Sequence, residues 1–166
     1  MNAEIVRTMV EYNYAAHRRL WDSITYLTDA QFVQDVDYSI GSVRNHMVHL
    51  INVDSRWLAR LQHAPVPDRL MNDDFTTVEA TRRKWAAVEA AVLSYAAAVS
   101  DADLNELIHY DMPSRGGARS NTRWEITLHM VVHGADHRAQ VLPILHPLGA
   151  PTFEQDFILY LWDKGN

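Results

Sequence analysis

The recurrence of apolar residues at every third or fourth position, over four long segments, most constrains what this chain can fold into. That spacing places the apolar side chains on one face of an α-helix. The four segments span about residues 3–27, 39–62, 76–99 and 122–146. Helices of this length must cover their apolar faces against one another. The sequence therefore predicts an all-α fold, a four-helix bundle.

Capping and helix-breaking residues mark the ends of these segments. Ser39 is the expected N-cap of the second helix, and the prolines Pro65 and Pro67 end it. A Glu three residues after a Thr predicts a capping box at Thr76–Glu79 and another at Thr122–Glu125. These two motifs would open the third and fourth helices.

Shorter segments join or follow the four helices. Thr28 and Asp29 break the first helix and precede a short turn. Residues 108–121 contain one proline and two glycines, which predicts an irregular segment or a short hairpin. The apolar run 157–162 predicts a short terminal helix. With no low-complexity linker and no repeat, we expect one domain over residues 1–166.

Composition excludes several classes of protein. The chain has 166 residues and no cysteine, so a disulfide scaffold and a thiolate metal site are impossible. Its net charge of −6 argues against binding nucleic acid through the phosphates, which usually requires a basic stripe. No stretch approaches the roughly 20 apolar residues of a membrane span. The first residues also lack the arrangement of a signal peptide, so we expect a cytoplasmic protein.

Nine histidines are the candidates for chemistry. His133 and His137 lie four residues apart on the apolar face of the fourth helix, with Met130 and Val141. Two imidazoles one turn apart can direct nitrogens at one point, which makes His-x-x-x-His a metal-ligand pattern. The alternative is an ordinary, partly buried role for each histidine. A third ligand would come from a facing helix.

The second helix offers His46 and His49 as that third ligand. Helical winding puts His46 about 60° and His49 about 120° from the centre of the apolar stripe, so periodicity alone favours His46. His129 lies about 80° from the centre of its own inward face and is expected to flank the site. The other histidines are expected to be structural or exposed: His17, His63, His109 and His146.

The fourth helix carries His133, His137, Arg138 and Gln140, and this segment resembles the His-x-x-x-His-Arg-Gly-Gln motif of the DinB/YfiT-like superfamily. Ala139 stands where the family has Gly, a departure expected to affect local packing more than metal binding. The resemblance extends to residues 12–15, 49–57, 148–150 and 156–158.

This resemblance implies a four-helix bundle in which one histidine of the second helix and two of the fourth bind a divalent metal, nickel or zinc. Matched position by position, the implied ligands are His49, His133 and His137, with His46 as the alternative. The choice of His49 disagrees with the winding argument. However, a bundle helix touches two neighbours, and its buried face can be wide enough to include His49. The resemblance also implies a homodimer.

Three neutral imidazoles leave a coordination position open for a small-molecule substrate. A metal held in this way activates water or an incoming thiolate. The resemblance implies a metal-dependent enzyme, either a hydrolase or an S-transferase that uses a low-molecular-weight thiol. The alternatives are a non-catalytic bundle stabilised by its metal and a stress-related protein that binds a small molecule without turnover. Further pocket candidates, which are more often core residues, are Tyr12, Trp57, Trp124 and Arg138.

Overall fold

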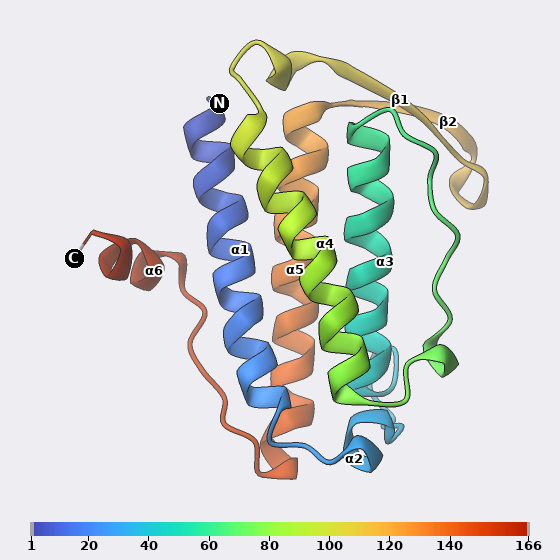
Figure 1. The fold of residues 1–166 in the computed structure, drawn as a ribbon, viewed down its shortest axis with the longest axis vertical. Helices are drawn as coiled ribbons and strands as arrows, with labels where there is room; N and C mark the ends of the chain where they lie inside the picture. Colours follow the sequence, from blue (N-terminus) through green and yellow to red (C-terminus); the bar gives the residue numbers. More distant parts are fainter. Residues whose placement is uncertain (1, 166) are drawn as a thin grey trace.

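The computed structural model describes residues 2–165, and four long helices dominate it (Figure 1). They are α1 (Ala3–Ile24), α3 (Val43–Leu61), α4 (Val78–Ala98) and α5 (Arg123–Leu145). Around the bundle, α1 contacts α5, α5 contacts α3, α3 contacts α4, and α4 closes the ring against α1. The four helices predicted from periodicity are therefore present.

The direction of the helices explains the long connections. Helices α3 and α4 run in the same direction, so the linker of residues 62–77 travels the length of the bundle before α4 begins (Figure 1). Helix α5 then runs antiparallel to α3. This arrangement belongs to the class of four-helix bundles that have long crossover connections.

Short elements complete the fold. They are helix α2 (Asp29–Val33), helix α6 (Phe157–Lys164), and the strands β1 (Leu107–Met112) and β2 (Gly117–Thr122). Four short 3₁₀ helices lie at Asn72–Asp74, Asp103–Asn105, Pro113–Arg115 and His146–Leu148. None of the described helices has both the length and the apolar character needed to cross a membrane.

The two strands correct the all-α prediction. They pair antiparallel, with Leu107 opposite Thr122 and Met112 opposite Gly117, and so form the hairpin that was one of two expectations for this segment. Gly116 and Gly117 both have a φ of 90°, a left-handed conformation that glycine adopts without steric cost. The hairpin covers the end of the bundle where α3 finishes and α5 begins (Figure 1).

The core lies along the axis of the bundle, where apolar faces of the long helices meet. Trp21 of α1 and Trp85 of α4 pack with their ring centroids 5.8 Å apart. Outside the bundle, α6 rests on α1 through Phe157, whose ring centroid is 5.1 Å from that of Tyr12. Other fully or almost fully buried side chains are Leu20, Ile24, Met47, Leu50, Ile51, Val141 and Leu145.

The start of α3 differs from the sequence prediction. Ser42, not Ser39, is the N-cap, and its side chain accepts a hydrogen bond from the backbone nitrogen of Asn45 at 3.2 Å. Ser39 has a φ of 54°, and a turn from Tyr38 to Gly41 separates it from the helix. The prediction of Ser39 as the cap was wrong because this tight turn delays the helix by three residues.

The start of α4 also shifts by one residue. Thr77 is the N-cap and accepts from the backbone nitrogen of Ala80 at 3.2 Å. Glu79 pairs instead with Arg83, at 3.0 Å, so the capping box predicted at Thr76–Glu79 was wrong. With Thr77 as the cap, Glu79 occupies the second helical position and lies one residue short of the capping-box position.

The end of the hairpin leads directly into α5. The backbone nitrogen of Thr122, the last residue of β2, donates to the Glu125 carboxylate at 2.8 Å, as the predicted capping box at Thr122–Glu125 requires. Continuity from strand to helix fixes the position of α5 relative to the hairpin.

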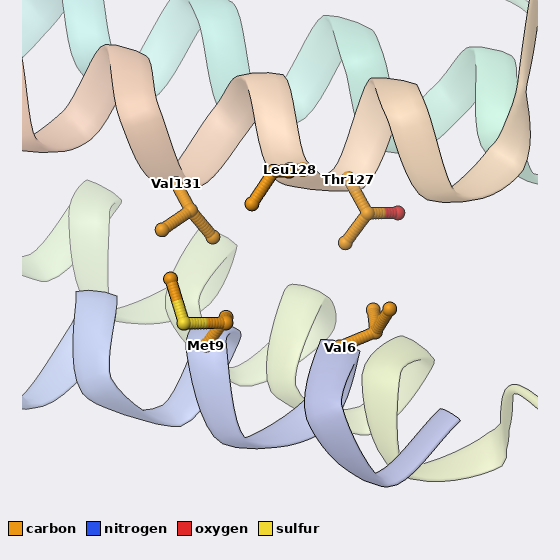
Figure 2. A pocket seen from close by; sticks show the side chains of 5 residues that line it. All are labelled: Val6, Met9, Thr127, Leu128 and Val131. Carbon is orange, nitrogen blue, oxygen red and sulfur yellow. The ribbon is translucent and has the colours of Figure 1, made fainter. Parts of the chain in front are cut away.

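A small apolar cavity lies between α1 and α5. Val6 and Met9 face Thr127, Leu128 and Val131 across it (Figure 2). Its volume of about 10 Å³ is at the lower limit for a single water molecule. This space is a packing defect between two helices and cannot hold a substrate.

Candidate metal centre

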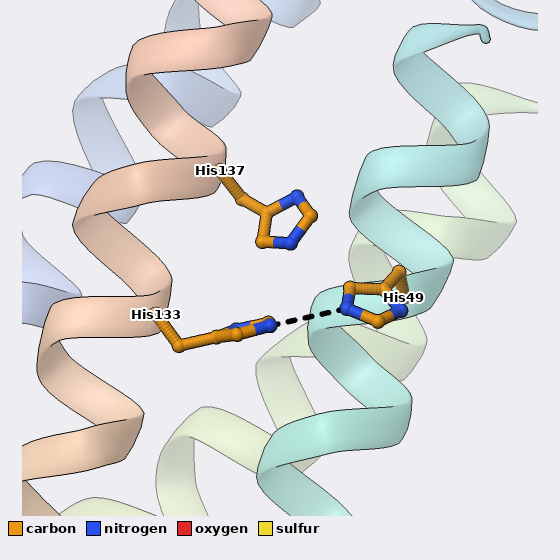
Figure 3. Close-up of side chains that lie close together, drawn as sticks. All are labelled: His49, His133 and His137. Carbon is orange, nitrogen blue, oxygen red and sulfur yellow. Dashed lines mark hydrogen bonds between the residues drawn. The ribbon is translucent and has the colours of Figure 1, made fainter. Parts of the chain in front are cut away.

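Three histidines from two helices meet inside the bundle. His49 of α3 faces His133 and His137 of α5, and the side chains point toward one another (Figure 3). One ligand atom from each ring lies within 4.8 Å of the other two. The four-residue spacing stacks His133 and His137 one turn apart, with ring centroids separated by 4.5 Å. The structure thus brings together all three residues that the resemblance selected.

Contacts among the imidazoles define which nitrogens face the centre. Nε2 of His49 lies 3.1 Å from Nε2 of His133. Nδ1 of His137 lies 2.9 Å from Nδ1 of His46, a fully buried residue of α3. The contact with His46 occupies Nδ1 of His137 and leaves its Nε2 free for an ion. His46 is therefore a neighbour of the three-histidine cluster, in contact with one of its members.

The electrostatics of the cluster favour neutral imidazoles. Burial, followed by repulsion from neighbouring histidines, lowers the pKa of His133 and His137 to about 4. Burial, and then the charge of Arg69, lowers the pKa of His49. Metal ions bind the neutral imidazole, so these side chains are in the binding form at neutral pH.

A cavity adjoins the cluster on the side of His49. It has a volume of about 410 Å³ and lies between α3, the linker of residues 62–77 and the hairpin turn at residues 111–115. Trp57 lines it and packs edge-on against Tyr110 of β1, with ring centroids 4.9 Å apart. Within residues 2–165, no carboxylate completes the three-histidine group as a fourth ligand. The arrangement is that of an open site rather than a closed structural one.

A buried polar network lies on the other side of α5. Arg138 is fully buried and donates to the side chain of Asn13, to its carbonyl at 3.2 Å, and to Gln155 at 2.9 Å. Tyr14 donates to Asp54 at 2.7 Å, and burial raises the pKa of Asp54 to about 7. Sequence reasoning assigned no role to Asp54, because its partner lies 40 positions away in the chain.

Close approach of α1 and α5 occurs at Gly134. A Cβ at this position would lie 2.5 Å from Asn13 Oδ1 and 2.9 Å from His17 Nε2. By contrast, Ala139 is exposed, so its methyl group meets solvent and leaves the helix contact unchanged. The methyl group of Ala139 therefore adds nothing to the close contact, which lies five residues earlier at Gly134.

The remaining histidines lie outside the cluster. His17 is fully buried between α1 and α5, and neither of its ring nitrogens has a hydrogen-bond partner among the described residues. His129 is exposed, and its ring centroid lies 5.6 Å from those of His133 and Trp57. Exposed positions, as expected, are occupied by His63, His109 and His146.

The fold and the cluster together define a class of protein: a helical bundle in which facing helices contribute three histidines to a candidate metal site. Comparison with family models identifies the family. Residues 1–165 match the DinB family, and the chain belongs to that family.

Two solved structures share this fold. A conserved protein from Enterococcus faecalis gives a TM-score of 0.65 at 17% identity, covering 82% of this chain and 92% of that one. A DinB family member from Shewanella denitrificans gives 0.56 at 19% identity, covering 93% of this chain and 88% of that one. Comparison with curated proteins gives no match.

Proposed function

We propose that this chain is a metal-dependent enzyme of the DinB family in which His49, His133 and His137 hold one divalent ion, zinc or nickel. The observation that carries the proposal is the convergence of three ligand atoms within 4.8 Å of one another. Two nitrogens that each lie about 2.0–2.1 Å from a tetrahedral zinc ion are about 3.4 Å apart. Closing the difference from 4.8 Å takes about 1.4 Å of movement, shared between two side chains, so the donor set fits the ion.

The residues around the ligands support this assignment. A bound divalent ion supplies Lewis acidity, which makes a nucleophile of water or of a thiol at neutral pH. His137 is held through Nδ1 by His46, at 2.9 Å, as metal-binding histidines generally are held by a second group. The cavity beside His49 admits a small molecule to the open side of the cluster.

Two reactions suit such a site: S-transfer from a low-molecular-weight thiol, and hydrolysis. The chain has no cysteine, so in S-transfer the thiol enters with the cosubstrate. A closed, purely structural metal site is the less favoured function, because the cavity of about 410 Å³ leaves one side of the cluster accessible. A protein that binds its ligand without turnover would share this geometry, and an activity assay distinguishes it from an enzyme.

The decisive measurement is the metal content of protein purified without an affinity tag. We expect about one ion per chain for the wild type and little or none for His133→Ala, because two imidazoles hold a divalent ion poorly. His109→Ala is the matched control, since His109 is exposed on β1. Equal metal content in wild type and His133→Ala would overturn the proposal.

The reaction is tested on the metal-loaded protein. Transfer of a low-molecular-weight thiol to an electrophile and hydrolysis of ester and amide substrates are followed with and without chelator. Activity that persists in His49→Ala but disappears in His46→Ala would transfer the role of third ligand to His46. Metal binding without either activity would favour the non-catalytic alternatives.

Assembly and location are part of the same proposal. The homodimer implied by the resemblance is tested by light scattering during size-exclusion chromatography. Cytoplasmic location and a single domain over residues 1–166 stay predictions from the sequence, as does the expectation that neither nucleic acid nor membrane is a partner.

A further inference from the structure

Four arginines line the cavity that adjoins His49. Arg56 and Arg60 come from α3, Arg69 from the linker and Arg115 from the hairpin turn. One carboxylate, Asp111, lines the same cavity. The lining thus carries an excess of positive charge, although the whole chain has a net charge of −6. Three separate segments of the chain contribute to this local concentration.

These four guanidinium groups lack the salt bridges to carboxylates that other arginines form among the described residues. None of them forms a salt bridge within residues 2–165, whereas Arg18, Arg44, Arg82, Arg83 and Arg123 all do. Arg56 instead donates to the carbonyl of Pro67, and Arg60 donates to the carbonyl of Arg56 at 3.1 Å. Arg60 also stacks over Trp57, 4.7 Å from the ring centroid. Arg56 and Arg60 are thus held in place by groups that do not neutralise their charge.

The positive charges that line the cavity repel one another and other cations nearby. Burial, and then repulsion from Arg56 one turn earlier on α3, lowers the pKa of Arg60. Burial is the main cause that lowers the pKa of His49, and the positive charge of Arg69 lowers it further. His49 lines the same cavity as the four arginines, so the cavity and the histidine cluster are in direct contact. Positive charges gathered in a concave site raise the local concentration of anions.

We propose that this cavity binds the oxyanion groups of a small molecule that carries at least two negative charges. The planar guanidinium fork matches a carboxylate or a phosphate with two parallel hydrogen bonds. The cavity volume of about 410 Å³ is within the range of small-ligand sites, roughly 300–1,000 Å³. Trp57 and Met112 offer apolar surface to the carbon skeleton between the anionic groups.

Placing the ligand's reactive end at His49, His133 and His137 rests on the proposed function. The arginine site itself does not, because neither the arginines nor the cavity requires an ion. Three neutral imidazoles would leave the full charge of a bound divalent ion in place, which adds to the attraction for an anionic substrate.

The test uses isothermal titration calorimetry on the full chain, with and without zinc, at constant ionic strength. Succinate is the dicarboxylate probe, glycerol 3-phosphate is the phosphate probe, and succinamide is a neutral analogue of succinate. The variant is Arg69→Gln with Arg115→Gln, both exposed and outside the helices and strands that form the core. The control is Arg83→Gln with Lys84→Gln, which removes the same charge from exposed positions on α4.

We expect at least one anionic probe to bind and the variant to lose about tenfold or more in affinity, since two charge-assisted contacts are removed. The control should change affinity by less than about twofold, because no residue of α4 lines the cavity and exposed charges are screened by salt. The probe that binds more tightly identifies carboxylate or phosphate as the natural group. Binding of succinamide equal to that of succinate, equal losses in variant and control, or no binding of either anion would overturn the proposal.

Metal content measured on the same samples separates the two proposals. A variant that keeps its zinc but loses the anion supports the arginine site. Zinc-free protein that still binds the anion supports it independently of the metal. Loss of metal from His133→Ala, with an anion affinity equal to that of the zinc-free wild type, would support both assignments.

Discussion

At the scale of single residues, the role of His46 follows from its contact with His137. It is fully buried, and its Nδ1 lies 2.9 Å from Nδ1 of His137. This contact fixes the ring of His137 so that Nε2 faces His49 and His133. We therefore assign His46 a positioning role, through the orientation of a ligand rather than through a bond to the ion.

We predict that His46→Ala weakens metal affinity by about 10–100-fold, the usual effect of removing a group that orients a ligand. His46→Gln should recover part of the affinity, because its amide can again hydrogen-bond Nδ1 of His137. Competition against a chromophoric chelator measures both values. Complete loss of stoichiometric metal in His46→Ala, with retention in His49→Ala, would show that His46 is itself a ligand.

Asp54 is a buried carboxyl group that destabilises the fold as it ionises. Burial raises its pKa from 3.8 to about 7, against opposing effects of Tyr14 and Arg138. Between these pH values the folded state keeps a proton that the unfolded chain has released, so this residue's contribution to stability falls as pH rises from 3.8 to about 7. Below pH 3.8 both states are protonated, and the contribution is complete.

Asp54→Asn should remove this pH dependence while preserving an acceptor for the Tyr14 hydroxyl. The free energy of unfolding of the variant, minus that of the wild type, is predicted to increase from about pH 4 to about pH 8, by at most about 4 kcal/mol. Urea denaturation of metal-free protein at several pH values measures the difference. A difference that is constant with pH would show that Asp54 does not titrate in this range.

At the scale of helices, contact between α1 and α5 depends on the absence of a side chain at Gly134. A Cβ there would lie 2.5 Å from Asn13 Oδ1, and Asn13 is itself held by Arg138. Gly134→Ala is predicted to lower the free energy of unfolding by about 1–3 kcal/mol, the usual cost of overpacking. The control is Gly165→Ala, whose added methyl would meet its nearest atom at 3.5 Å. Equal effects in the two variants would contradict the close-contact explanation.

Helices and their order were predictable because they depend on local patterns. Apolar periodicity located the four long helices, and the Thr122–Glu125 pair marked the start of α5 correctly. The caps at Ser39 and Thr76 were wrong, because a turn or a neighbouring threonine competes within a few residues of each start. The exact residue at which a helix begins depends on tertiary packing, and the spacing of apolar residues in the sequence does not specify that packing.

The histidine cluster was only partly predictable from the sequence. Spacing on one helix selected His133 and His137, but winding favoured His46 over His49, and only the family register selected His49. In the structure both α3 histidines contact α5 histidines, so one apolar stripe was too narrow a description of α3. The sequence did not predict a role for Arg69, because only the path of the linker brings this residue to the cavity.

At the scale of the whole molecule, the three-histidine cluster makes the stability of the fold depend on both pH and metal binding. Burial lowers the pKa of His133 and His137 from 6.5 to about 4. The unfolded chain therefore takes up protons on these residues first as pH falls below 6.5. Their contribution to the stability of the metal-free protein is complete above pH 6.5 and is lost as pH falls toward 4.

Metal binding should stabilise the same protein at neutral pH, because the ion binds the folded cluster and not the dispersed histidines of the unfolded chain. Free metal at about 100 times Kd adds about 2.7 kcal/mol, which raises Tm by roughly 5–10 °C in a chain of this size. Differential scanning calorimetry before and after chelation measures this shift. Protonation of His133 and His137, with pKa values of about 4, should progressively abolish the shift as pH approaches 4. His133→Ala should melt at the same temperature with and without metal at every pH, and a metal-dependent shift in that variant would place the ion elsewhere in the molecule.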